Sequence, residues 1–236
     1  MRKIIAAILL ICLLLPAAAM GAGFTDDEAS VYEITSENIV VEEIYGFHGV
    51  YVYAEIINKG KTDFELLNSE TKILDGSGNV ITILKGMRMY PEVVPAGEKG
   101  YLYTFGEIIG NEKPVSCSVK IKVNKPILFG VQNVENRDTQ ITQEVNMMDM
   151  TSTYFETKVR NNSNQIMYDL NVCFILQEKS TNKIVKIVER SLYRGTGIMP
   201  GSEILLREEY MPTRNGFDPN AYTLTALSYI TEMASR

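Results

Sequence analysis

The chain contains no tryptophan and a single histidine, His48, and it has three cysteines among its 236 residues. A structural zinc site needs four cysteine or histidine ligands. His48, Cys117 and Cys173 give three, because Cys12 lies inside an apolar run near the N-terminus. The G-x-S-x-G turn of many hydrolases, the Walker phosphate loop and a G-x-G-x-x-G dinucleotide loop are also missing. We therefore predict that the protein is not an enzyme and that it holds no metal and no cofactor.

Long hydrophobic runs are missing except near the N-terminus, where residues 4–15 are entirely apolar. This run follows Arg2 and Lys3 and precedes small residues up to Gly23, which is the order of a secretory signal peptide. It is shorter than the roughly 20 residues of a transmembrane helix. We expect residues 1–23 to be a signal peptide, with an uncleaved anchor as the alternative. The mature protein would then be secreted or extracellular, with or without attachment to the cell envelope, and would have no membrane span.

Positive charge is scarce, because 23 Lys and Arg residues stand against 29 Asp and Glu residues, for a formal net charge of −6. Removal of Arg2 and Lys3 with the signal peptide would make the mature chain more acidic still. An acidic chain without a basic block does not suit nucleic acid or an anionic membrane surface. We expect a protein or a cell-envelope component as the partner, and no nucleic acid.

Only two cysteines, Cys117 and Cys173, remain after signal cleavage. A pair of cysteines in a secreted chain can form a disulfide. These two fall at positions that do not correspond in the repeat described next, so we expect both to be small buried hydrophobic residues instead. Apolar packing, and not a set of disulfides, must then hold the fold together.

The two halves of the chain repeat one another at a nearly constant spacing of about a hundred residues, which indicates an internal duplication. The matches run through five segments in register and include a Pro-Gly-type turn in each half. The clearest pairs are Tyr51 with Tyr154, Ile56 with Val159, Asn58 with Asn161, Pro95 with Pro200, and Glu98 with Glu203.

Each half alternates apolar and polar residues, which is typical of strands with one buried face. The predicted inward sets are Val50, Val52, Ala54 and Ile56 in the first half, and Leu170, Val172, Phe174 and Leu176 in the second. No window has a long helical stripe, and Asn, Gly and Ser cluster between the strands.

These patterns predict an all-β protein made of two tandem immunoglobulin-like antiparallel β-sandwiches. The first would span residues 24–125 and the second residues 126–236, with a short linker near residues 123–130. The lack of tryptophan excludes the antibody type of this sandwich but not the architecture.

The residues from Glu55 to Phe105 resemble the small extracytoplasmic β-sandwich modules of bacteria called FxLYD-type domains. The resemblance rests on turn residues, which are Asn58 and Gly60, Asp75 and Gly78, and Pro95 and Gly97. The second half keeps Asn161, Pro200 and Gly201 but has no Asp-Gly hairpin. The resemblance implies a secreted accessory or binding unit and no enzyme activity.

Three short motifs could bind ions, but each suits a structural role better. His48 lies in a predicted loop without partners for catalysis. The segment DGSGN at residues 75–79 offers oxygen atoms for calcium but lacks the following bidentate Glu, so we expect a hairpin turn. Met147, Met148 and Met150 could ligate copper, although we expect a loop there.

The most suggestive candidates for a binding site are four tyrosines. Tyr51 and Tyr53 lie two residues apart, as do Tyr101 and Tyr103, so each pair shares one face of a strand. Side-by-side aromatic rings can anchor a partner or stack on a sugar, while core packing is the alternative. We expect the protein to be a non-enzymatic interaction module that binds a protein or wall partner through exposed sheet surface. The alternative is a small-ligand or carbohydrate-binding protein that uses the groove between the repeats.

Overall fold

The structure is a computed structural model that describes residues 31–44, 47–109, 112–127, 129–145, 151–192, 197–210 and 217–233. The predicted signal peptide and Met147, Met148 and Met150 lie outside the described residues. Over the described ranges the chain is all-β, as predicted, with fifteen strands, one 3-10 turn at Pro219–Ala221 and no α-helix.

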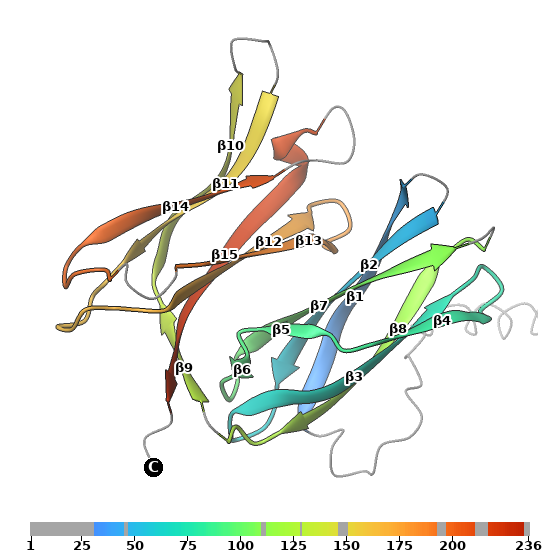
Figure 1. Cartoon of the computed structure of the whole chain (residues 1–236), viewed down its shortest axis with the longest axis horizontal. Coiled ribbons are helices and arrows are strands. Elements are labelled where there is room, and N and C mark those ends of the chain that lie inside the picture. Colours follow the sequence, from blue (N-terminus) through green and yellow to red (C-terminus); the bar gives the residue numbers. More distant parts are fainter. Residues whose placement is uncertain are drawn as a thin grey trace, which may run out of the picture.

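The first eight strands form two antiparallel sheets (Figure 1). Sheet A has the order β1-β2-β7-β5, and sheet B is built around β3, which pairs with β4, β6 and β8. The strands are β1 (Tyr32–Ile44), β2 (Phe47–Asn58), β3 (Phe64–Leu74), β4 (Val80–Lys85), β5 (Arg88–Tyr90), β6 (Val93–Val94), β7 (Lys99–Ile109) and β8 (Ser116–Asn124).

The remaining strands form two further antiparallel sheets. Sheet C has the order β13-β12-β15-β9, and sheet D has the order β10-β11-β14. The strands are β9 (Phe129–Val134), β10 (Asn136–Val145), β11 (Thr151–Arg160), β12 (Leu170–Glu178), β13 (Ile184–Ser191), β14 (Glu203–Tyr210) and β15 (Tyr222–Met233). No sheet mixes strands from β1–β8 with strands from β9–β15, although the domain boundaries given above stay predictions.

Each half of the chain has its own hydrophobic core, and the predicted inward residues occupy both. The first core contains Val50, Val52, Ala54 and Ile56, and the second contains Leu170, Val172, Phe174 and Leu176, all of them buried. The alternation of apolar residues along β2 and β12 therefore identified the core-facing side of each strand correctly.

A third cluster of buried residues joins the two halves, and we call it the seam. It packs the outward face of sheet A against the outward face of sheet C, where β13 lies against β1 and β2 (Figure 1). Its buried members are Tyr53, Tyr90 and Tyr101 from the first half and Cys173, Ile175, Ile184 and Ile187 from the second.

A buried asparagine at the end of β2 fixes the turn that the sequence repeats. The side chain of Asn58 is fully buried. Its Nδ2 donates hydrogen bonds to the carbonyls of Thr62 and Val94, both at 2.9 Å, and its Oδ1 accepts one from the amide of Gly60 at 2.9 Å. One side chain thus closes the loop after β2 and holds it to the strand before β7.

The same arrangement recurs at the end of β11, where Asn161 is also fully buried. Its Nδ2 donates to the carbonyls of Gln165 and Ile198, both at 2.7 Å, and its Oδ1 accepts from the amide of Ser163 at 3.0 Å. We call each of these two sets of bonds an asparagine staple, and their recurrence accounts physically for the repeated motif.

The backbone around each staple corrects one detail of the predicted repeat. The amide of Gly97 bonds to the carbonyl of Asn58, and the amide of Gly201 bonds to the carbonyl of Asn161. Both glycines have positive φ, 81° and 74°, which side-chain-bearing residues rarely adopt. The glycines are therefore the equivalent residues, and matching Pro95 with Pro200 was wrong by one position.

The same bonds show that the acidic residues of the turn were also mismatched. The amide of Asn58 bonds to the carbonyl of Glu98, whereas the amide of Asn161 bonds to the carbonyl of Ser202. Glu98 therefore corresponds to Ser202 and not to Glu203, because the bond needs only a backbone carbonyl at this position and leaves the side chain unconstrained.

Residues 75–79 form the predicted hairpin turn between β3 and β4. The Oδ1 atom of Asp75 accepts hydrogen bonds from the amides of Ser77 and Asn79, both at 2.8 Å, and Gly78 has a φ of 83°. The carboxylate of Asp75 is thus used in holding the turn, which is the structural role expected from the sequence.

Candidate binding face

The four predicted tyrosines lie on the two central strands of sheet A, on its outward face. Tyr51 and Tyr53 belong to β2, and Tyr101 and Tyr103 belong to β7. Tyr53 lies directly opposite Tyr103, and the two rings stack with their centroids 5.6 Å apart. The structure therefore brings residues that are some fifty positions apart in sequence into one array.

Phe105 extends this array and was missed by the sequence analysis. It is the next outward residue of β7 after Tyr103, and it lies opposite Tyr51 with ring centroids 4.8 Å apart. The signal was available, since Tyr101, Tyr103 and Phe105 keep the two-residue period of one strand face. We call these five aromatic residues the aromatic ladder.

One end of the aromatic ladder is covered by the second half of the chain. Tyr53 is 1% exposed and Tyr101 is 8% exposed, and both belong to the seam. An external partner therefore has no access to these two tyrosines in this arrangement. The predicted role in partner binding remains a prediction for Tyr51 and Tyr103, which are half-buried at the border of the seam.

Two polar contacts cross between the halves beside the aromatic ladder. The Nδ2 of Asn38 on β1 donates a hydrogen bond of 2.8 Å to the carbonyl of Ile184 on β13. The ammonium group of Lys186 lies over the ring of Tyr51, 5.1 Å from its centroid, which is within the range of a cation–π contact. These contacts fix how sheet C sits on sheet A and mark where the covered end stops.

Burial in the seam shifts the ionisation of its tyrosines. Desolvation raises the pKa of Tyr101 to about 12, and the neighbouring carboxylate of Glu55 adds to the shift. Desolvation also raises the pKa of Tyr90 to about 12, and it raises the pKa of Tyr53 further still. The phenols of the seam are therefore neutral at any physiological pH.

The other end of the aromatic ladder is open to solvent. Phe105 is 40% exposed, and Ile109, two outward positions further along β7, is 86% exposed. Apolar side chains that are this exposed on a regular strand often belong to interaction surfaces when they are contiguous with other apolar residues. Phe105 is contiguous with Tyr51, so the ladder continues from the seam into free surface.

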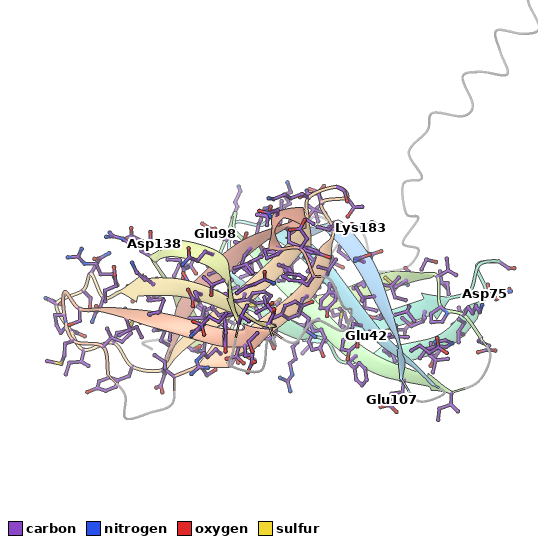
Figure 2. The ribbon with its side chains drawn as sticks, turned by 90° about the horizontal axis from the view of Figure 1, so that it is seen from above. Glu42, Asp75, Glu98, Glu107, Asp138 and Lys183 are labelled. Atoms are coloured by element: carbon purple, nitrogen blue, oxygen red, sulfur yellow. The ribbon has the colours of Figure 1, made fainter. Side chains whose placement is uncertain are left out.

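Acidic residues flank this open end. Glu42 on β1 and Glu107 on β7 both lie opposite Gly49 of β2, so they occupy one row across the sheet with no side chain between them. Figure 2 shows both carboxylates at the same end of the sheet. Glu107 is exposed, Glu42 is half-buried, and the Glu42 carboxylate helps to raise the pKa of the Tyr51 phenol after desolvation. The open end is thus aromatic, apolar and negatively charged.

Sheet D contains a related surface in which the acids are already neutralised. The guanidinium of Arg207 stacks on Tyr154, 3.5 Å from the ring centroid. It also forms ion pairs with Glu144 and with Glu156, the latter at 2.9 Å. By strand register Tyr154 corresponds to Tyr51. In the second half, the face equivalent to the aromatic ladder therefore includes a cation of the same sheet, Arg207.

The single histidine lies in a strand, contrary to the predicted loop. His48 belongs to β2, opposite Glu43 and Ile108, because the short FHGV segment is the first part of the strand and not a loop before it. Its Nδ1 is buried without a hydrogen-bond partner in the part of the chain that the structure describes. No acid orients the ring through this nitrogen, as a catalytic histidine would require.

The outer edge of sheet B is closed by side chains of β1. Glu37 accepts a hydrogen bond of 2.9 Å from the amide of Val119 on β8, and Tyr32 donates one of 2.9 Å to the carbonyl of Ile121. Desolvation raises the pKa of Glu37, and the Val119 bond opposes that shift. These side chains cover backbone groups that a partner strand would otherwise bind, so this edge does not suit strand addition.

Both cysteines are free, as expected. Cys117 is half-buried against the first core, and burial raises its pKa to about 12. Cys173 is fully buried in the seam, and burial raises its pKa as well. Neither thiol has the lowered pKa of a reactive cysteine.

Other kinds of site find little support. Within residues 31–233, wherever they are described, no group of three or more His, Cys, Asp or Glu residues could hold a metal ion, and no helix is long and apolar enough to cross a membrane. A shallow pocket of about 180 Å³ lies over β3 and β8, lined by Asn68, Ser69, Glu70, Lys120, Ile121 and Lys122. Ligand sites are usually larger, at roughly 300–1,000 Å³.

Comparison with known proteins identifies no family for the chain. No protein-family description matches it. No curated protein matches it either. Among solved structures, a transglutaminase from red sea bream is similar at 9% sequence identity and a TM-score of 0.22. The alignment covers 86% of this chain but 30% of the transglutaminase, and so low a TM-score supports no argument about fold or activity.

Proposed function

We propose that the protein is a secreted, non-enzymatic interaction module that binds a protein partner through the open end of the aromatic ladder. The observation that carries this proposal is the continuation of the ladder beyond the seam, to Phe105 and Ile109, which are 40% and 86% exposed. At protein interfaces a few clustered side chains, many of them aromatic, provide most of the binding free energy. The covered end of the same ladder already packs against another sheet, which supports the idea that this face suits protein contacts.

We also propose that the two halves are immunoglobulin-like sandwiches related to the FxLYD-type domains. The two asparagine staples support this relationship, since Asn58 and Asn161 were among the residues on which the resemblance rests. Such a relationship would agree with a secreted module attached to, or acting near, the cell envelope.

The alternative of a small-ligand site between the repeats has less support. The contact between the halves is filled by the buried tyrosine, isoleucine and cysteine side chains of the seam. The pocket over β3 and β8 lies on sheet B, away from the seam. We therefore propose a protein and not a carbohydrate as the partner.

Site-specific photo-crosslinking tests the proposed function. A photoreactive phenylalanine analogue would replace Phe105 in the mature protein, and Leu205 of sheet D, which is 57% exposed, would be the matched control. Each protein is incubated with native cell envelope, illuminated and analysed by mass spectrometry. We expect one dominant crosslinked protein from position 105, and an excess of unlabelled wild-type protein should abolish this crosslink. Position 205 should not give that product.

Two outcomes would argue against the proposal. The same products from both positions would indicate non-specific contact, and no product at position 105 that the wild-type protein displaces would mean that this face binds no envelope protein. Circular dichroism of both labelled proteins would show that neither replacement has disturbed the fold.

A further inference from the structure

The outward residues at the end of β7 alternate in character. Phe105, Glu107 and Ile109 follow one another on the same face, so an acid stands between two exposed apolar side chains. Outward residues of one strand are spaced by roughly 6.5–7 Å. An extended peptide has the same spacing, so a strand-like segment laid along β7 could match all three positions.

The acid in the middle has a second acid beside it. Glu42 and Glu107 lie in one row, separated by β2, so their backbones are roughly 10 Å apart at the usual distance between strands. In the part of the chain that the structure describes, neither carboxylate forms an ion pair with a lysine or arginine. Lys186 lies over Tyr51, on the side of the ladder towards the seam.

The second half of the chain indicates which group such a surface accepts. Glu144 lies opposite Ser152 of β11 as Glu42 lies opposite Gly49 of β2, so the two glutamates correspond. In sheet D this glutamate pairs with Arg207, which also stacks on Tyr154. The position of Arg207 is occupied by a tyrosine, Tyr103, in sheet A. Sheet A thus keeps the acid and the aromatic ring but lacks the arginine. Lys186 of sheet C covers the Tyr51 ring instead, and among the described residues it forms no ion pair with Glu42 or Glu107.

We infer that the partner supplies a cation for Glu42 and Glu107 as part of an extended segment with the pattern apolar–x–cation–x–apolar. The lysine or arginine would lie between Glu42 and Glu107, and the flanking apolar side chains would cover Phe105 and Ile109. The inference rests on the proposed function and adds the chemistry of the partner. The formal net charge of −6 on the chain further favours a cationic segment.

A peptide titration followed by NMR tests the inference. The cationic probe is acetyl-Ser-Val-Ser-Arg-Ser-Val-Ser-amide, and the neutral probe carries citrulline, which has the shape of arginine without its charge. Both are titrated against the isotope-labelled mature protein at low and at physiological salt. We expect the arginine peptide to shift the amide signals of β7 and to bind about twofold to fivefold more tightly than the citrulline peptide.

Variants of the protein locate the effect. Glu42→Gln together with Glu107→Gln should weaken binding of the arginine peptide about twofold to fivefold and reduce its dependence on salt. Glu98→Gln, which changes an exposed acid on the turn before β7, should leave the affinity unchanged. Phe105→Ala should lower the affinity for both peptides, because both make the same apolar contact with Phe105.

The outcomes separate the two claims. Equal affinity of the two peptides, or binding that survives loss of both glutamates, would overturn the cationic chemistry. If Phe105 nevertheless gives a specific crosslink in the envelope experiment, the proposed function stands. The absence of any shift on β7 with either peptide would also overturn the inference, and the crosslinking result would then decide the proposed function separately.

Discussion

Replacement of the stapling asparagines should destabilise one half of the protein at a time. In Asn58→Ala, the carbonyls of Thr62 and Val94 lose a donor and the amide of Gly60 loses an acceptor, so the fully buried Asn58 side chain gives up three hydrogen bonds. A hydrogen bond contributes about 0.5–1.5 kcal/mol, and a buried group left without a partner costs about 1–3 kcal/mol. We therefore expect the free energy of unfolding to fall by about 2–5 kcal/mol. Asn161→Ala should do the same in the second half.

Pulsed alkylation of the two cysteines measures each half separately. Cys117 lies in the first half and Cys173 in the second, so mass spectrometry after a pulse of iodoacetamide reports which half has unfolded at each urea concentration. With an m-value of about 2 kcal/mol/M, the Cys117 midpoint of Asn58→Ala should fall by about 1–2.5 M. In the same variant, the urea midpoint for alkylation of Cys173 should fall less than that of Cys117. In Asn161→Ala, the Cys173 midpoint should fall more than the Cys117 midpoint.

Two controls separate hydrogen bonding from packing. Asn58→Asp keeps the shape of the side chain but replaces its donor with a charged acceptor that faces two carbonyls, so it should be at least as destabilising as alanine. Asn124→Ala, at an exposed position at the end of β8, should change stability by less than about 0.5 kcal/mol. An Asn58→Asp variant as stable as the wild type, or an Asn58→Ala variant as stable as Asn124→Ala, would show that the hydrogen bonds of Asn58 do not stabilise the first half.

Three further predictions concern the seam and the edge of sheet B. Between pH 10 and 12 the protein should lose stability, because unfolded tyrosine titrates near pH 10 whereas Tyr90 and Tyr101 titrate at about 12. The contribution of these two tyrosines to the free energy of unfolding is complete below pH 10 and is lost as the pH rises through 12. Tyrosinate absorbance measures the titration, and a titration of all the tyrosines near pH 10 would contradict this prediction. Tyr101→Ala should speed alkylation of Cys173 by opening the seam, whereas Tyr101→Phe should leave the rate near that of the wild type. Glu37→Ala should lower stability by about 1–3 kcal/mol in urea unfolding and promote self-association on size-exclusion chromatography, because the amide of Val119 loses its acceptor. Glu37→Gln keeps an acceptor oxygen and should behave more like the wild type.

Local sequence patterns were sufficient to predict the strands and their core-facing sides. Val50 and Val172 are examples, because a two-residue period has only two possible faces and the apolar one turns inward. The conformation of the repeated turn was also predictable from Gly97 and Gly201. The matching of prolines was not reliable, since proline fits more than one position of such a turn.

The covered end of the aromatic ladder could not be predicted in the same way. Tyr53 and Tyr103 have the same spacing and chemistry as residues of an open face, and only a long-range contact decides which of them is buried. One signal of that contact was present in β12, where Cys173 and Ile175 are apolar on the side that faces away from the core. A strand that is apolar on both sides is buried on both sides.

Hydroxyl-radical footprinting of the free protein tests most directly the claim that one end of the aromatic ladder is covered and the other open. Oxidation of individual side chains is followed by mass spectrometry, and the rates are corrected for the intrinsic reactivity of each residue type. We expect fast oxidation of Phe105, which is exposed, and slow oxidation of Tyr53 and Tyr101, which are buried in the seam. Equally fast oxidation of all three would show that the halves do not pack together through the seam.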